Sequence, residues 1–166
     1  MRRRLYVAIV AVHAVFLLAW AGSLEWSRAT ATTIRLDVVE RDPRDLLRGD
    51  YVTLAYRIST LPPGALPTGS VPPGGRVWVA LAPDGETWRV AAAAPTREAL
   101  ALGPGQRLIA GTLGRGGAQV VYGIERYYVP EGKGTPPRGR IEAEVALAAD
   151  GRPHLLRLLV DGRPYP

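Results

Sequence analysis

The stretch that decides the fold reads Arg48-Gly49-Asp50-Tyr51-Val52-Thr53-Leu54-Ala55-Tyr56. An extended strand places alternate side chains on opposite faces of a sheet. We therefore expect a strand over residues 50–59, with Leu54 and Tyr56 on the face that packs against the core. Tyr51 belongs to the opposite face, where an exposed aromatic side chain is typical of a binding surface.

The residues before this strand predict a short helical turn over residues 42–49. Asp42 stands at an N-cap position, Pro43 at the first helical position, and Gly49 just past the end. The turn therefore delivers the chain into the strand at Asp50.

Two interpretations are open for the charged residues of this segment. In the structural one, Asp50 is a loop staple, satisfied by loop amides or by the guanidinium of Arg44 or Arg48. The binding interpretation depends on a second group of polar and aromatic residues further along the chain: Glu125, Tyr127 and Glu131. If the two blocks are neighbours in one sheet, one groove is lined by Arg44, Asp50, Tyr51, Glu125 and Glu131.

This pattern resembles the signature of the GDYXXLXY family, because Gly49-Asp50-Tyr51 is followed by Leu54 and Tyr56. Residues 122–132 resemble the family's second block, and residues 159–162 its closing strand. The resemblance covers nearly the whole chain. It implies an N-terminal membrane segment, an exported β-rich domain and a multi-pass membrane protein as genomic neighbour, but no activity. One departure is the stretch 132–139, which is longer than the family's short glycine linker.

The N-terminal segment predicts a single membrane anchor. Residues 5–21 are apolar apart from His13, and three arginines precede them. Extended to residue 24, the run spans about 30 Å as a helix, the thickness of a bilayer's hydrocarbon core. The positive-inside rule keeps the arginines in the cytoplasm and places the rest of the chain outside. A cleaved signal peptide is the alternative, because Ala19-Trp20-Ala21 fits the cleavage pattern.

The part after the anchor reads as a series of short strands. The expected strands are residues 33–40, 50–59, 76–82, 86–93, 108–113, 119–128, 140–148 and 154–161. Glycine-containing turns at 83–85, 114–117 and 149–153 join the last six into three hairpins. The fold class expected is mainly β: an antiparallel sandwich or partly open barrel of about eight strands with one N-terminal transmembrane helix. The divisions expected are a cytoplasmic tip (1–4), an anchor (5–24), a stalk (25–32) and an extracytoplasmic domain (33–166).

The composition excludes several classes of function. The chain has no cysteine, and therefore no disulfide, thiol nucleophile or thiolate metal site. Its formal charge is +6, but Arg2, Arg3 and Arg4 supply half of that charge at the membrane. The other arginines are scattered among acidic residues without a basic stripe, so we expect no nucleic-acid partner.

Catalytic patterns are also missing from the sequence. A Ser-His-Asp site needs a base beside its nucleophile, but His13 lies in the apolar segment and His154 has no serine motif around it. Signal peptidases share the anchor, the exported β domain and a strand that begins Gly-Asp, yet they need a Ser-Met pair and a strand lysine. Here the only methionine is Met1, and the only lysine, Lys133, lies in a Gly-rich loop.

Cofactor and metal sites find little support. One exported histidine without cysteine does not make a zinc site, and no phosphate-cradling motif precedes a helix. A calcium site built from Asp42, Asp45, Asp50 or Glu131 stays open, although the spacing of an EF-hand loop is absent. We therefore expect no cofactor and no metal.

These observations together predict a non-enzymatic accessory or binding module at the membrane, with an integral membrane protein as partner and no identifiable small-molecule ligand. The alternative is a carboxylate-based hydrolase or a signal-peptidase-like relic. An enzyme would gather carboxylates in a concave pocket, whereas a binding module would present a flat patch around Tyr51 and Tyr127.

Overall fold

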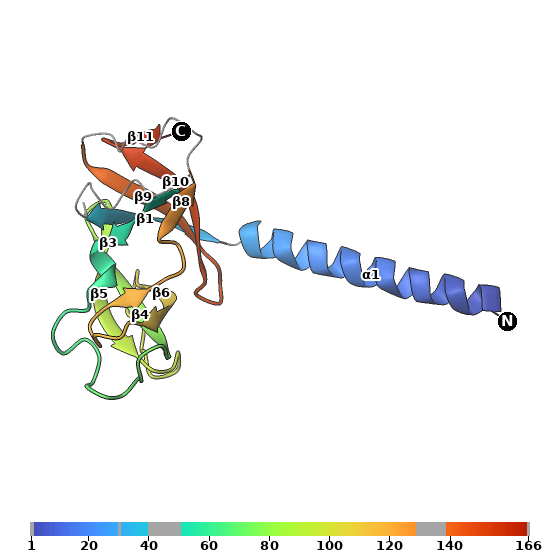
Figure 1. Cartoon of the computed structure of the whole chain (residues 1–166), viewed down its shortest axis with the longest axis horizontal. Helices are drawn as coiled ribbons and strands as arrows, with labels where there is room; N and C mark the ends of the chain where they lie inside the picture. Colours follow the sequence, from blue (N-terminus) through green and yellow to red (C-terminus); the bar gives the residue numbers. More distant parts are fainter. Residues whose placement is uncertain (1, 30, 40–50, 129–138, 166) are drawn as a thin grey trace. The chain divides into compact units, whose positions relative to one another are not determined.

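The computed structural model describes residues 2–29, 31–39, 51–128 and 139–165. The chain forms two compact units, Met1–Ala31 and Thr32–Pro166. The first unit consists of the helix α1 (Arg2–Ala29), which includes the expected helical segment 5–24 (Figure 1). Large apolar side chains along α1 are exposed, among them Val12, Phe16 and Leu18. We expected residues 5–24 to form a transmembrane helix. In the described part of the chain, however, no helix is long and apolar enough to span a membrane.

The larger sheet of the second unit is built around β1 (Thr32–Val39). Buried Ile34 and Leu36 alternate in β1 with the partly exposed Arg35 and Asp37, as period two requires. The strand order is β11-β10-β9-β1-β3, and every neighbouring pair is antiparallel. The other strands are β3 (Ala55–Tyr56), β9 (Ile141–Leu147), β10 (Pro153–Val160) and β11 (Arg163–Tyr165).

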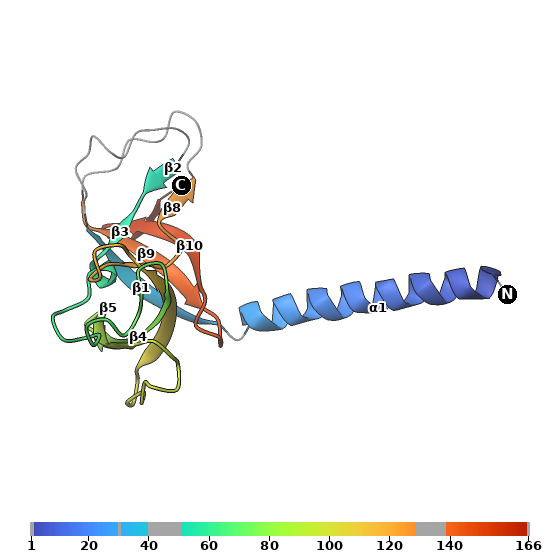
Figure 2. The ribbon, with the colours of Figure 1, turned by 60° about the horizontal axis from the view of Figure 1, so that its bottom comes forward.

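A second antiparallel sheet has the order β5-β4-β6-β7. Its strands are β4 (Arg76–Asp84), β5 (Thr87–Ala94), β6 (Arg107–Leu113) and β7 (Val120–Val121). A further pair joins β2 (Tyr51–Thr53) to β8 (Arg126–Tyr128), and Figure 2 shows these two strands side by side. The 3-10 helix η1 (Arg57–Ser59) follows β3 directly.

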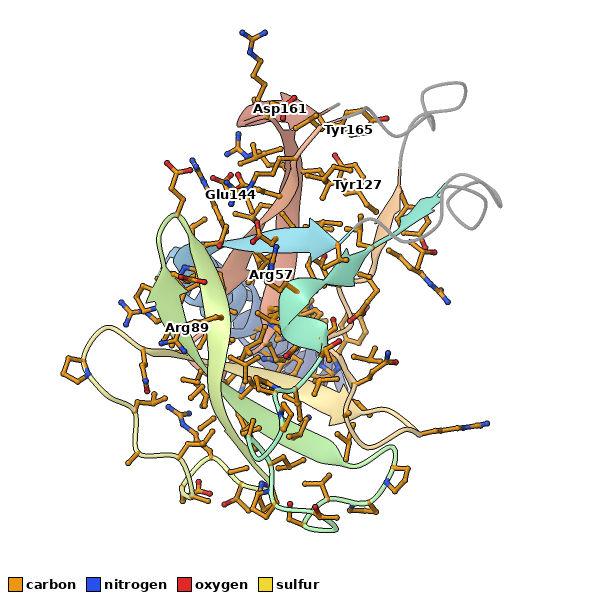
Figure 3. All side chains as sticks on the ribbon, turned by 90° about the vertical axis from the view of Figure 1, so that its left-hand side faces the viewer. Arg57, Arg89, Tyr127, Glu144, Asp161 and Tyr165 are labelled. Carbon is orange, nitrogen blue, oxygen red and sulfur yellow. The ribbon has the colours of Figure 1, made fainter. Side chains whose placement is uncertain are left out.

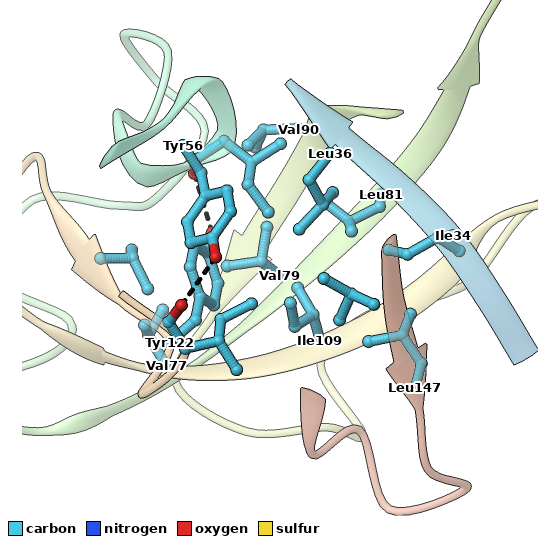
Figure 4. Packing of buried hydrophobic residues seen from close by; sticks show 14 of the residues in the cluster. Ile34, Leu36, Tyr56, Val77, Val79, Leu81, Val90, Ile109, Tyr122 and Leu147 are labelled. Carbon is cyan, nitrogen blue, oxygen red and sulfur yellow. Dashed lines mark hydrogen bonds between the residues drawn. The ribbon is translucent and has the colours of Figure 1, made fainter. Parts of the chain in front are cut away.

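One hydrophobic core serves both larger sheets. Figure 4 shows its side chains converging from β1 and β9 and from β4, β5 and β6. Contributors from the first sheet include Ile34, Leu36, Tyr56, Val145 and Leu147, and those from the second include Val77, Val79, Leu81, Val90 and Ile109. The stretch 61–75 is a loop, and its Leu61 and Val71 are buried in the core.

The mainly β antiparallel fold and the three hairpins are confirmed. The expected strand count is wrong, because the described residues form eleven short strands. The expected strand 50–59 is divided into β2, β3 and η1, and the expected strand 119–128 into β7 and β8. The terminal strand β11 was not expected. The helical turn expected at residues 42–49 lies outside the described residues.

Candidate functional site

Two chain segments, 51–61 and 118–128, lie side by side in the second unit. At one end β2 pairs with β8, with Tyr51 opposite Tyr128, and the amide of Leu54 donates to the Glu125 carbonyl at 2.7 Å. At the other end Thr60 lies opposite Gln119. The Thr60–Gln119 pair has the same register as the pairs between β2 and β8, as if one antiparallel ladder ran through both ends. We call this pair of segments the split ladder.

The ladder is interrupted because its two segments join different sheets. Ala55 and Tyr56 pair with Val39 and Val38 of β1, and η1 follows. Across the gap, Val120 and Val121 pair with β6. Residues 55–59 and 120–124 therefore diverge between two ends that stay in register.

Two tyrosines bridge the interruption in a reciprocal way. The Tyr56 hydroxyl donates to the Ile124 carbonyl at 2.6 Å, and the Tyr122 hydroxyl donates to the Ile58 carbonyl at 2.8 Å. Both side chains are buried, and Figure 4 shows them beside the core. Burial and, secondly, the negative charge of Glu125 raise the pKa of both hydroxyls above the usual value, so each stays a neutral donor. Side chains thus replace the missing ladder hydrogen bonds.

Glu125 serves the same segment as an internal staple. Its Oε1 accepts a hydrogen bond from the amide of Tyr122 at 2.5 Å. Its Oε2 accepts one from the amide of Gly123 at 2.8 Å. Gly123 has a φ of 82°, a conformation that glycine adopts without strain. Both carboxylate oxygens are therefore engaged in holding a tight turn.

A groove of about 430 Å³ opens along the interruption. Buried Leu54, Tyr56 and Val120 line it, together with half-buried Glu125. Its exposed lining residues are Val39, Arg57, Thr60, Gln119 and Val121. It runs between β3, the last strand of one sheet, and β7, the last strand of the other.

Leu54 and Tyr56 of the first sequence motif and Glu125 of the second block line this groove. The chain matches the GDYXXLXY protein family over residues 13–158. It belongs to that family. Comparisons with curated proteins and with solved structures each returned no match.

The structure brings the two blocks of the family signature together, which the binding interpretation required. Leu54 and Tyr56 are buried and Thr53 is exposed, in agreement with the expected alternation. Tyr127 is half-buried, and Figure 3 shows it near Tyr165. The Tyr127 hydroxyl donates a hydrogen bond to the Tyr165 carbonyl at 3.4 Å. Tyr127 therefore packs against the core and does not mark a flat exposed patch.

Several expected site residues lie wholly or partly outside the described residues. The backbone of Tyr51 pairs with that of Tyr128. Outside the described residues lie Asp42, Arg44, Asp45, Arg48, Gly49, Asp50 and Glu131. The expected meeting of Arg44, Asp50 and Glu131 with Glu125, and the calcium alternative, stay predictions.

A charged row that the sequence reasoning missed lies on the non-core face of the larger sheet. Asp37 accepts a hydrogen bond from Arg140 Nη2 at 3.0 Å and pairs with Arg57 Nε at 3.2 Å. Glu142, directly opposite Asp37 on β9, is only 3% exposed. Its Oε1 lies 3.0 Å from the same Arg140 nitrogen but accepts no hydrogen bond within the described residues. The hydrogen bond with Asp37 and the charge of Glu142 raise the pKa of Arg140.

The two carboxylates of this row, Asp37 and Glu142, both lie beside Arg140. Asp37 is engaged by two guanidinium groups and by the Thr87 hydroxyl at 3.4 Å. Within the described ranges no three histidine or carboxylate side chains converge to hold a metal. The sequence does carry a signal for this row. Polar residues alternate with apolar ones in both strands: Arg35 and Asp37 in β1, and Glu142 and Glu144 in β9.

Proposed function

We propose that this chain is a non-enzymatic, extracytoplasmic accessory module, attached to a membrane through its N-terminal segment, that binds a segment of an integral membrane protein. The binding site is the groove of the split ladder. One observation carries the proposal: a groove lies between the two signature segments, while the hydroxyls of Tyr56 and Tyr122 and the carboxylate of Glu125 are already used to shape it.

The engaged state of those groups argues for binding over catalysis. The hydroxyls of Tyr56 and Tyr122 donate to backbone carbonyls, and the carboxylate of Glu125 accepts backbone amides. A general acid or base has to reach a substrate with a free proton or lone pair. Tyr56 and Glu125 line the groove instead, and Tyr122 holds the segment beside it through its bond to Ile58.

The lining of the groove favours an extended peptide segment. Val39 and Val121 offer apolar contact at its edge, and Thr60 and Gln119 offer uncharged hydrogen-bonding groups. The flanking strands β3 and β7 are the edges of their sheets, and sheet edges are where extended segments commonly add. An extended stretch of a membrane partner's exposed loop has the shape and chemistry for this site.

Attachment to the membrane is supported by the N-terminal sequence. The apolar run from Leu5 to Ala21 follows three arginines, and α1 exposes large apolar side chains along its length. The proposal predicts that the full-length protein sediments with membranes. A protease added outside the membrane should digest the β unit while leaving the N-terminal tip protected.

Site-specific photo-crosslinking in native membranes tests the groove. A photoreactive residue at Val121, which is 50% exposed, should give one discrete adduct with an integral membrane protein. The same probe at Leu102, which is 46% exposed and lies outside the groove, is the matched control. Equal adducts from both positions, or none from Val121 and Val39, would show that the groove is not the binding site.

A further inference from the structure

A second cavity lies at the junction of the two larger sheets, away from the groove. Its volume is about 270 Å³, and it is lined by Arg76, Trp78, Ala110, Asp150 and Arg152. Arg76 and Trp78 are two positions apart on β4 and share one face of the sheet. Ala110 lies opposite Trp78 on β6, and its small side chain leaves the space open. Asp150 and Arg152 come from the turn between β9 and β10.

The turn is held against the sheet by its backbone. The amide of Ala110 donates to the Gly151 carbonyl at 2.9 Å. Gly151 has a φ of 79°, and a Cβ there would come within 2.9 Å of Trp78 Cζ3. Only glycine fits this conformation and this close approach, so the wall of the cavity is fixed.

The cavity carries two guanidinium groups and one carboxylate. Arg152 Nε pairs with Asp150 Oδ2 at 2.6 Å, and the Arg152 amide donates to Asp150 Oδ1 at 3.1 Å. Burial raises the pKa of Asp150, but the hydrogen bonds from Arg152 outweigh it and the pKa is lowered, so the carboxylate stays ionised.

The remaining donors face no acceptor among the described residues. Both oxygens of Asp150 are occupied, and Arg152 uses only Nε in the ion pair. Arg76 lies over the Trp78 ring, with Cζ 6.0 Å from the ring centroid, which is within reach of a cation–π interaction. Its donors then remain for a ligand. The site therefore has one positive charge in excess and donors from two arginines.

We propose that this cavity binds a phosphate-type anion, of the kind that a phospholipid headgroup carries. Arginine forks bind phosphate oxygens bidentately, and two arginines line this cavity. The cavity is smaller than the 300–1,000 Å³ or so of sites for drug-sized ligands, which suits a single small anionic group.

The position of the cavity in the β unit favours a phospholipid headgroup as the source of the anion. Thr32, the first residue of β1, lies opposite Leu147, and the turn that lines the cavity begins just after Leu147. Thr32 follows the end of α1 by only a few residues. If the N-terminal segment is attached to a membrane, chain length alone keeps this end of the β unit near the lipid phosphates. The source of the anion, but not the anion site itself, rests on the proposed membrane attachment.

Equilibrium binding to the full-length protein in a non-ionic detergent tests the proposal. The probes are inorganic phosphate, dihexanoyl phosphatidylglycerol, and a monoacylglycerol of equal chain length that has no phosphate. We expect saturable binding of at least one phosphate-bearing probe and none of the monoacylglycerol. Binding of the lipid identifies a headgroup site, and binding of inorganic phosphate alone identifies a free-anion site.

Matched arginine variants decide whether this cavity is responsible. R76Q and R152Q should each weaken binding about tenfold, the change expected from the loss of one charge-assisted hydrogen bond. R115Q, which removes the same charge from the turn after β6, should bind normally. No saturable binding of either phosphate probe, or an equal loss in R115Q, overturns the proposal. Crosslinking at Val121 does not depend on this cavity, so the two proposals fail separately.

Discussion

Tyr56 and Arg57 are neighbours in the chain, yet they fasten the same segment in opposite ways. Tyr56 points into the core and ties the segment to Ile124 through a neutral, buried hydrogen bond. Arg57 points outward and ties it to Asp37 through an ion pair near solvent. The first contact belongs to the split ladder and the second to the charged row.

The segment around Tyr56 and Arg57 is thus fixed by a buried hydrogen bond on one face and by an ion pair on the other. Buried neutral hydrogen bonds do not respond to salt, but leaving one unmade is costly. Exposed ion pairs contribute less and are screened by salt. The split ladder should therefore dominate stability, and the charged row should adjust it.

Truncating Tyr56 should produce the largest loss. Tyr56→Ala removes a buried aromatic ring and leaves a cavity, so we expect the free energy of unfolding to fall by about 3–5 kcal/mol. Urea unfolding of the full chain in detergent measures this loss. Leu156→Ala, at an exposed position on β10, is the control and should change stability by less than about 0.5 kcal/mol. Similar losses in both variants would contradict the central place of the split ladder.

Removing a hydroxyl alone should have an intermediate effect that depends on pH. Tyr122→Phe leaves the Ile58 carbonyl without its donor, at a cost of about 1–3 kcal/mol near neutral pH. The pKa of both tyrosines is raised in the fold, whereas unfolded tyrosines ionise near pH 10. Unfolding therefore releases protons above about pH 10, and the stability of the unmodified protein falls as the pH rises further.

Unfolding measured between pH 8 and pH 11 checks this sign. The stability of Tyr122→Phe should fall less steeply than that of the unmodified protein, because one of the two ionising groups is gone. A parallel decline in both proteins would show that the Tyr122 hydroxyl is not protected in the fold.

Much of this arrangement follows from the sequence. Period two in residues 50–59 places Leu54, Tyr56 and Ile58 on one face, and all three are buried. Gly-containing turns located the three hairpins, because these turns are set by local backbone geometry.

The interruption of the ladder could not be predicted in the same way. The alternation continues through residues 55–59, and the break arises because β3 pairs with β1 while β7 pairs with β6. Such pairings depend on register between distant segments. The contact of Asp37 with Glu142 has the same origin. The short strand β11 contains Pro164, which an edge strand tolerates.

Neutralising Asp37 should have a smaller effect than losing a tyrosine hydroxyl, and one that salt reduces. Asp37→Asn weakens the contacts with Arg57 and Arg140, whose side chains are well exposed, and we expect a loss of about 0.5–1 kcal/mol at low ionic strength. In 1 M salt the Debye length is about 3 Å, so the difference from the unmodified protein should shrink. Tyr122→Phe should show no such dependence. If both variants respond equally to salt, the contrast between the two fastenings is wrong.

The smallest effect is expected at an ion pair of the same face that is open to water. Arg35 Nη1 and Glu86 Oε2 are 3.9 Å apart, and both side chains are well exposed. Glu86→Gln should change the free energy of unfolding by less than about 0.5 kcal/mol, because solvent screens such a pair and its geometry is loose. Asp37→Asn removes the same formal charge from a site that is largely covered. Comparing the two variants at equal ionic strength therefore separates burial from charge, and a loss in Glu86→Gln as large as that in Asp37→Asn would assign the effect to net charge alone.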